Sequence, residues 1–329
     1  NLANLYHDVG KFTEAGKRYE EALKRRREIL SENHLDVARS IGNLAAHYRS
    51  LGRFDEAEQH YKQALAVLKD ALGETHPVYS VMLRNLAKLY ESKGEPGRAV
   101  PELKKSLEIA REKLELTAAV QSERQQLGMA KMFRGTLDRW LSLSTRTELP
   151  ADETYEHVLR WKGAVFARQL EQRRYRRTVA RSADPKVAGL IKDLESVACR
   201  IAALALSRPP AGQEQSHWQR LGELSRKKEE LEAKLATVSP EFRKQQAVSQ
   251  LTLDQLKELL PTSVVLVDLL EYRHSSPPPN GKGRWKTERR LMAFVVRRGE
   301  LIRQLELGPV KPIAKAVKKW LRTTDRPNP

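Results

Sequence analysis

The chain has a single cysteine in 329 residues, Cys199, which excludes a disulfide framework and any cysteine-based zinc site. Aromatic residues make up only 6% of the sequence, which argues against a β domain packed around aromatic side chains. No run of 18 apolar residues occurs, so a transmembrane helix is not expected. No basic-then-apolar leader opens the chain, so nothing marks it for secretion. These features predict a soluble, helix-rich, cytoplasmic protein of two or three domains.

Positive charge is in excess, with 60 Lys and Arg against 42 Asp and Glu, a formal net charge of +18. Such a charge would attract nucleic acid, acidic peptides or an anionic membrane surface, or it could simply solvate long helices. The basic run of residues 173–177 could clamp phosphates, but its arginines form no single stripe and no ladder of stacking aromatics accompanies them. We therefore expect neither a nucleic-acid site nor membrane binding.

The first third of the sequence matches itself at an offset of 42 residues, without a gap. A constant period of this length indicates a repeat architecture with three copies of one unit. The aligned sets are Asn1, Asn43 and Asn85; Leu2, Leu44 and Leu86; Ala3, Ala45 and Ala87; Tyr6, Tyr48 and Tyr90; Gly10, Gly52 and Gly94; and Ala15, Ala57 and Ala99.

Each unit is predicted to be a helical hairpin. Leu44, Ala45 and Tyr48 form one apolar stripe on the first helix. Gly52 closes that helix in a left-handed conformation, and Asp55 opens the second, where an acid complements the helix N-terminus. The recurring alanines let the paired helices approach closely. One hairpin cannot bury its stripe alone, so neighbouring units must stack into a superhelix.

These residues resemble the tetratricopeptide repeat, in the 42-residue form known from kinesin light chains, with the pattern clearest at residues 43–57 and 85–99. Three repeats are assigned to residues 1–126. The third is degenerate, with Pro101 expected in about the first turn of its second helix, where a missing N–H matters least. A helix from Gln121 to Leu143 is expected to cap the stack, within a capping segment of residues 127–150. The resemblance implies a concave groove that binds a protein or peptide.

The asparagines Asn1, Asn43 and Asn85 occupy one position per repeat, beside the apolar stripe. A side-chain amide can both donate to and accept from a peptide backbone, which suits sequence-tolerant binding of an extended chain. In similar repeats asparagines at this position line the groove. The alternative is that these amides hydrogen-bond the adjacent repeat and hold the stacking geometry, and both roles are compatible.

His34 and His76 also repeat at 42 residues, and we interpret them as turn residues rather than metal ligands because no carboxylate motif accompanies them. Cys199 is expected to be an inert thiol buried in or near a helical seam, because no histidine lies near it in the sequence. No metal or other cofactor is predicted.

Residues 151–250 are expected to form a helical linker. A helix is predicted over residues 152–180, and two near-heptad segments follow at 187–206 and 216–238. Since a short turn rich in proline and glycine joins these two segments, they should form an antiparallel coiled hairpin.

Strand signals begin only after residue 251. A short capped helix precedes the β-branched, apolar run Ser263–Tyr272, and a polar loop is expected from His274 to Lys286. Further strands are predicted at Arg290–Val296 and Leu301–Leu307, followed by an amphipathic helix over Val310–Leu321. The expected fold is thus mainly α, with a superhelix, a helical linker and the opening strands of an α/β domain at residues 251–329.

This last region resembles the start of a CHAT domain, a caspase-like module often found after tetratricopeptide repeats, in residues 260–272, 290–296 and 307–309. Parts of the linker, Val158–Ala164 and Ser239–Arg243, are also similar to such proteins. The resemblance implies a cysteine peptidase with a His–Cys pair, whose segments would lie beyond Pro329. His274 follows the first strand, the wrong place, and no cysteine comes after it. We therefore assign no catalytic residue.

Three functions remain open at this point. The repeats could recognise a partner for a caspase-like peptidase whose active site lies outside this chain. They could equally belong to a non-catalytic interaction scaffold. Nucleic-acid binding through the basic surface is the third alternative.

Overall fold

The structure is a computed structural model of the 329-residue chain. It describes residues 2–117, 123–162, 185–207, 213–240, 242, 252–283 and 285–324, and the statements below concern these residues. Within them no helix is long and apolar enough to cross a membrane.

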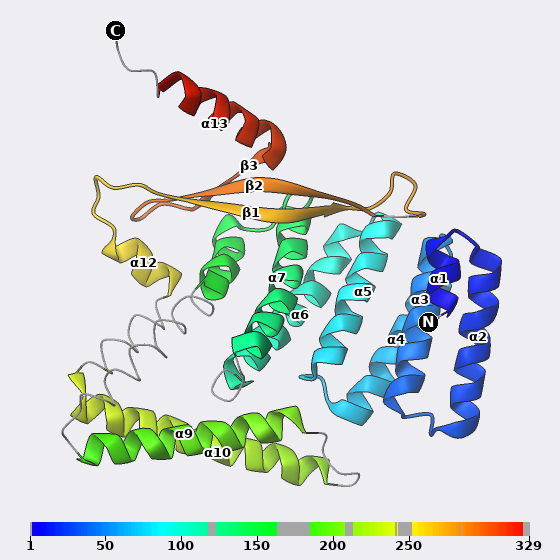
Figure 1. The fold of residues 1–329 in the computed structure, drawn as a ribbon, viewed down its shortest axis with the longest axis horizontal. Helices are drawn as coiled ribbons and strands as arrows, with labels where there is room; N and C mark the ends of the chain where they lie inside the picture. The colour runs from blue at the N-terminus through cyan, green and yellow to red at the C-terminus, as the bar shows by residue number, and fades with distance from the viewer. Residues whose placement is uncertain are drawn as a thin grey trace.

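The N-terminal half of the structure is a stack of helical hairpins (Figure 1). Each hairpin packs its two helices against each other and against the next hairpin, as the 42-residue period predicts. The helices are α1 (Leu2–Asp8), α2 (Phe12–Ile29), α3 (Leu35–Ser50), α4 (Phe54–Leu72), α5 (Pro77–Lys93) and α6 (Pro96–Thr117).

The recurring small residues have the expected roles. Gly52 and Gly94 have positive φ angles of 77° and 83° at the ends of α3 and α5, a conformation that glycine adopts without a steric penalty. The alanines that recur in the second helix of each repeat are completely buried, which allows the close helix contact. They are Ala15, Ala57 and Ala99.

His34 and His76 lie in the turns between repeats, as predicted, and each caps the following helix. The Nδ1 atom of His34 accepts a hydrogen bond from the backbone N–H of Asp36 at 3.1 Å, and that of His76 accepts from Val78 at 3.2 Å. Each imidazole thereby satisfies one of the N–H groups that a helix start leaves unpaired.

The third repeat differs from the prediction at its second helix. Because Pro96 begins α6, Pro101 lies beyond the first turn, inside the helix. The next helix, α7 (Glu123–Ser144), agrees with the predicted capping helix to within two residues. It does more than cap the stack, because Trp140, Leu137 and Leu141 are completely buried between the repeats and the elements that follow.

The predicted helical hairpin is present as α9 (Pro185–Leu206) and α10 (Glu214–Val238), which pack against each other around their own apolar cluster. This hairpin lies on the side of the helical stack that faces away from the sheet, where α9 contacts α6 (Figure 1). The prediction for Cys199 is wrong, because its side chain is exposed. The seam is built from Ile191, Leu194, Val197 and Ile201, and position 199 lies between these contacts on the outer side of the helix.

The C-terminal region contains α12 (Leu253–Leu259), the strands β1 (Leu266–Ser276), β2 (Lys286–Val296) and β3 (Arg303–Pro309), and α13 (Val310–Thr324). The strands form an antiparallel sheet in the order β1-β2-β3. β1 and β2 extend further than predicted, since His274 pairs with Glu288 and Ser276 with Lys286. The expected loop from His274 to Lys286 is therefore shorter, and its polar residues partly belong to the strands.

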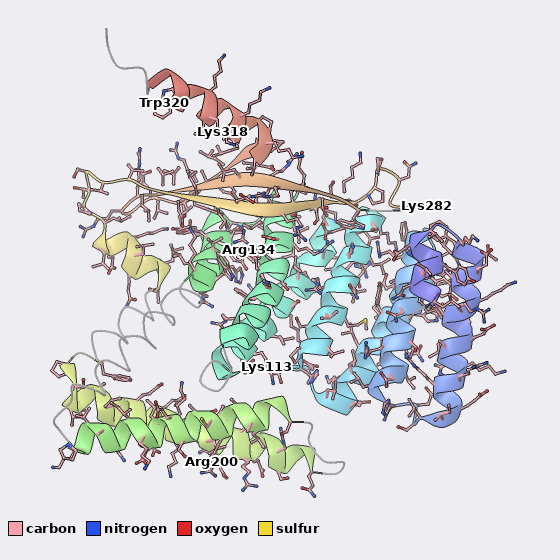
Figure 2. All side chains as sticks on the ribbon, in the orientation of Figure 1. Lys113, Arg134, Arg200, Lys282, Lys318 and Trp320 are labelled. Carbon is pink, nitrogen blue, oxygen red and sulfur yellow. The ribbon has the colours of Figure 1, made fainter. Side chains whose placement is uncertain are left out.

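The inner face of the sheet shares one apolar core with the repeats. Leu270, Tyr272 and Phe294 are buried against α7 and the helical segment 151–162, and Tyr155 stacks on Phe294 with ring centres 4.9 Å apart. The opposite face exposes Val267, Leu269, Leu305 and Leu307. Helix α13 lies on that outer side, where Lys318 and Trp320 project from it (Figure 2).

Candidate functional site

The predicted asparagines are found at equivalent positions of adjacent helices. Asn43 on α3 and Asn85 on α5 are both half-buried, and each directly precedes completely or almost completely buried residues of the core. They therefore lie at the border of the apolar stripe, as the repeat pattern predicts. Asn1 lies outside the described residues.

Basic residues lie on the same two helices as these asparagines. Lys88 follows Asn85 by three residues and Arg84 directly precedes it, so all three share one side of α5. Arg49 lies two helical steps of three residues beyond Asn43 on α3. Arg84 also reaches the next repeat helix, where its Nη1 donates to Thr136 Oγ1 of α7 at 3.3 Å.

A tryptophan from the C-terminal sheet lies against these cations. Trp285 directly precedes β2, and its ring centre is 5.1 Å from Lys88 Nζ and 4.2 Å from Arg139 Cζ. Both contacts have the geometry of cation–π interactions. We refer to Arg49, Arg84, Lys88 and Arg139 as the cationic cluster.

Burial changes the protonation equilibrium of this cluster. Burial and, to a smaller extent, the neighbouring charges of Arg49 and Arg139 together lower the pKa of Lys88 to about 7, while Glu91 acts in the opposite sense. Burial also lowers the pKa of Arg84 and of Arg139, although arginine remains charged. The surroundings thus favour the neutral form of Lys88 more than water does.

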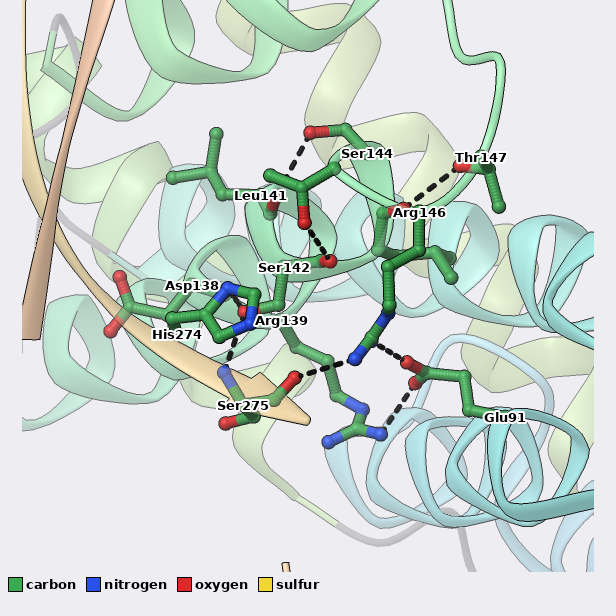
Figure 3. Close-up of polar contacts among 12 residues, drawn as sticks. Glu91, Asp138, Arg139, Leu141, Ser142, Ser144, Arg146, Thr147, His274 and Ser275 are labelled. Carbon is green, nitrogen blue, oxygen red and sulfur yellow. Dashed lines mark hydrogen bonds and ion pairs between the residues drawn. The ribbon is translucent and has the colours of Figure 1, made fainter. Parts of the chain in front are cut away.

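Glu91 connects three elements through a buried ion-pair network (Figure 3). Its carboxylate, 1% exposed, pairs with Arg139 of α7 and with Arg146 in the turn that follows α7. Arg146 also donates to the carbonyl oxygen of Ser275 on β1 at 3.0 Å, and Ser142 Oγ accepts from the Ser275 N–H at 2.9 Å. The third repeat, α7 and the sheet are thereby linked through one carboxylate.

The loop between β1 and β2 rests on the turns inside the repeats. The N–H of Gly283 donates to the Ser50 carbonyl oxygen at the end of α3, at 3.2 Å. Gly281 lies against the Ser92 carbonyl oxygen at the end of α5. Lys282 extends beside Gly52 from the same loop (Figure 2). The β1–β2 loop therefore contacts the repeats at the C-terminal ends of α3 and α5, the helices that carry Asn43 and Asn85.

A separate open hollow of about 460 Å³ lies between α2, α3 and α4. Leu44 and His60 line it together with charged residues of α2. Neither Asn43 nor Asn85 lines this hollow, so it is distinct from the predicted site.

Cys199 and His274, the single cysteine and the histidine that follows the first predicted strand, lie on different elements. Cys199 is on α9, which packs against α6, whereas His274 is on β1, which packs against α7. The imidazole of His274 lies 3.3 Å from the Tyr272 hydroxyl, and burial lowers its pKa. The structure assigns neither residue a reacting partner among the described residues.

Sequence reasoning missed the cationic cluster and Trp285. One signal in the sequence could have pointed to the cluster. Arg49 and Glu91 occupy the same position in successive repeats, and charged residues there depart from a purely apolar pattern. No comparable signal exists for Trp285, which lies outside the repeats.

The tetratricopeptide-repeat family matches residues 1–70 and 41–112. Similar solved structures include BtubC (BKLC) from P. vanneervenii, at 20% identity and a TM-score of 0.38, with 71% of this chain and 78% of that chain covered. A kinesin light chain-like protein with nearly identical repeats from Podosopora anserina matches at 21% identity and a TM-score of 0.33, covering 76% and 93%. No curated protein matches. Residues 1–112 are thus tetratricopeptide repeats, and the chain is a mainly helical repeat protein with a small antiparallel sheet.

Proposed function

We propose that this chain is a protein-interaction scaffold that binds an extended peptide segment across α3 and α5. The observation that carries the proposal is the repeated asparagine, half-buried at the same position of both helices. An amide there can bind the backbone of a ligand without reading its side chains.

The first prediction tests these asparagines. A peptide is selected from a displayed random library on the whole chain, and its affinity is then measured for the wild type and for Asn43→Ala/Asn85→Ala. We expect about a 10-fold or greater loss of affinity, because each lost amide removes hydrogen bonds worth about 1 kcal/mol. Thermal stability should barely change.

The matched control is Asn4→Ala on α1. Asn4 occupies a different position of the repeat from Asn43 and Asn85, and its side chain accepts a hydrogen bond from the Tyr19 hydroxyl. If melting drops sharply in the double variant while affinity per folded molecule stays constant, the amides hold repeat stacking instead.

We further propose, from the resemblance of residues 260–309, that the C-terminal sheet belongs to a CHAT-like, caspase-related module for which the repeats recognise a partner. A purely non-catalytic scaffold fits the same repeats equally well. The presence of the reactive His–Cys pair that complete CHAT domains carry would distinguish the CHAT-like module from the non-catalytic scaffold. Neither Cys199 nor His274 supplies this pair here.

Nucleic-acid binding is the weaker alternative. The cationic cluster is largely buried and contacts Glu91 and Trp285 rather than forming an open phosphate-binding track. The arginine run at residues 173–177 lies outside the described residues.

A further inference from the structure

Helix α13 separates apolar and basic residues onto two faces. The apolar series is Ile313, Val317 and Trp320, and the basic series is Lys311, Lys315 and Lys318. Both series advance by four and then three positions, a spacing that keeps residues on one side of a helix. Because the two series are two positions apart, slightly more than half a helical turn, they form an apolar stripe and a lysine stripe on opposite sides. Lys319, four positions after Lys315, extends the lysine stripe.

Both stripes of α13 are open to solvent. From Lys311 to Trp320 every side chain except that of Ile313 is exposed, and those of Val317 and Trp320 are 47% and 63% exposed. The helix contacts β2, but it rises from the end of β3 away from the sheet (Figure 1). Apolar side chains that are gathered in one stripe, rather than scattered over a surface, mark an interaction site.

The sheet adds apolar side chains on the same side of the molecule. Val267 and Leu269 of β1 and Leu305 and Leu307 of β3 are exposed on its outer face, and α13 lies on that side (Figure 2). The exposed apolar surface of the C-terminal region is therefore larger than the helix alone.

The charge of α13 has one sign. The helix contains no Asp or Glu, and within the part of the chain that the structure describes none of the four lysines of the lysine stripe forms an ion pair. Their charge is thus not balanced by a neighbouring carboxylate and acts on the surroundings, where it attracts an anionic surface.

A lipid bilayer suits this combination better than a protein does. Protein–protein interfaces are depleted in lysine, whereas helices that lie in the headgroup region of a bilayer carry lysine on one face and tryptophan or aliphatic residues on the other. A second copy of the chain would bring two positively charged helices together, and like charges repel.

We propose that α13 binds the surface of an anionic lipid bilayer, with Val317 and Trp320 inserted among the headgroups and the lysine stripe beside the lipid anions. The 15 residues of α13 rise by about 22 Å, which is too short for a hydrocarbon layer of about 30 Å, so the helix lies along the surface. The net charge and the arginine run at residues 173–177 do not lead to an expectation of membrane binding, and α13 is the element that changes this. The proposal is independent of the peptide proposed for α3 and α5.

The test measures co-sedimentation of the whole chain with vesicles of phosphatidylcholine, either pure or containing about 30% phosphatidylserine. Partitioning should be about 10-fold or more stronger on the anionic vesicles and should fall as salt is added. Lys315→Gln/Lys319→Gln should lose about 10-fold or more, because each charge near the surface contributes roughly fivefold. The matched control, Lys192→Gln/Lys227→Gln, removes two exposed lysines of the α9–α10 hairpin and should bind like the wild type.

The apolar stripe provides an independent readout. Trp320→Ala should weaken partitioning on anionic vesicles about 10-fold, because insertion and charge act together, and Val317→Ser should weaken it in the same direction. Ile29→Ala on α2, which removes a side chain that is 80% exposed, is the control and should leave binding unchanged. The altered side chains are exposed, so the melting temperature should stay the same in all these variants.

Several results would overturn the proposal while leaving the peptide scaffold intact. These are equal partitioning on both kinds of vesicle, binding to neither, or binding that survives Lys315→Gln/Lys319→Gln. Binding that depends on the lysines but not on Trp320 or Val317 would show an electrostatic contact without insertion. A dimer in sedimentation equilibrium that Trp320→Ala dissociates, without vesicle binding, would assign the apolar stripe to a second copy. Submicromolar binding of single-stranded RNA, lost in Lys315→Gln/Lys319→Gln and again without vesicle binding, would assign the lysine stripe to nucleic acid.

Discussion

At the scale of single residues, the repeat position that Arg49 occupies shows how the three units differ from one another. The equivalent residues are His7, Arg49 and Glu91, and each contacts a different neighbour. The His7 imidazole lies 2.9 Å from the Ser50 hydroxyl, whereas the buried Glu91 carboxylate pairs with Arg139 of α7 and with Arg146 just after it. The repeated backbone therefore keeps its geometry while the side chain at this position makes a different contact in different repeats.

Glu91→Ala should strongly destabilise the protein. Removing this carboxylate leaves the buried Arg139 and the partly exposed Arg146 without this counterion, at a cost of about 3–5 kcal/mol. The measurement is the free energy of unfolding in urea. Glu95→Ala is the control, because its partly exposed pairs with Arg98 and Lys93 contribute about 0–1 kcal/mol.

The double variant Glu91→Met/Arg139→Met should regain a large part of that loss, since an apolar pair of similar size needs no charge balance. Equal stability of Glu91→Ala and Glu95→Ala would show that water, not protein, surrounds these arginines.

At the scale of elements, the contact between the β1–β2 loop and the repeat turns joins parts distant in the sequence. Gly281 has a φ of 70°, and a Cβ at this position would overlap the Ser92 carbonyl oxygen. Glycine is required there for two reasons, its left-handed backbone and the close approach of another main chain.

Gly281→Ala should therefore loosen this loop more than Gly283→Ala does. Both positions have positive φ, but a Cβ at Gly283 meets no atom within 4 Å. Both variants introduce backbone strain. The difference between their free energies of unfolding, about 1–3 kcal/mol, therefore measures the steric overlap of the Cβ atom at position 281. It is measured by urea unfolding and by amide exchange at the C-terminal turns of α3 and α5. Equal losses would mean that backbone strain alone matters.

At the scale of the whole molecule, the sheet and the repeats share one core, whereas the α9–α10 hairpin has its own. The two conceivable catalytic groups lie on elements of these two separate parts, Cys199 on α9 and His274 on β1. Cys199 is exposed on α9 and His274 is held beside Tyr272 on β1. A thiol nucleophile needs a base within hydrogen-bond reach.

We accordingly expect no peptidase activity from this chain. The purified protein is incubated with a proteome-derived peptide library and, separately, with a thiol-reactive activity probe. Labelling of exposed Cys199 by a simple alkylating reagent is expected and serves as the reactivity control. Specific cleavage that disappears in Cys199→Ala would contradict the expectation.

Much of the fold could be predicted from the sequence because its signals are local. The period of 42 residues, the left-handed glycines and the buried alanines all act within one hairpin. The heptad spacing predicts α9 and α10, and the β-branched runs predict β1 and β2, for the same reason. Asn43 and Asn85 were likewise placed beside the core by the helical period alone.

Other features were decided only by the tertiary structure. Lys88 and Trp285 are about 200 residues apart in the sequence and meet because the sheet packs on α7 and its loop reaches the repeats. The exposure of Cys199 depends on which face of α9 meets α10, and the role of Glu91 depends on the arginines opposite it. Such contacts leave no periodic trace, because each joins one residue to one distant partner and repeats nowhere else in the chain.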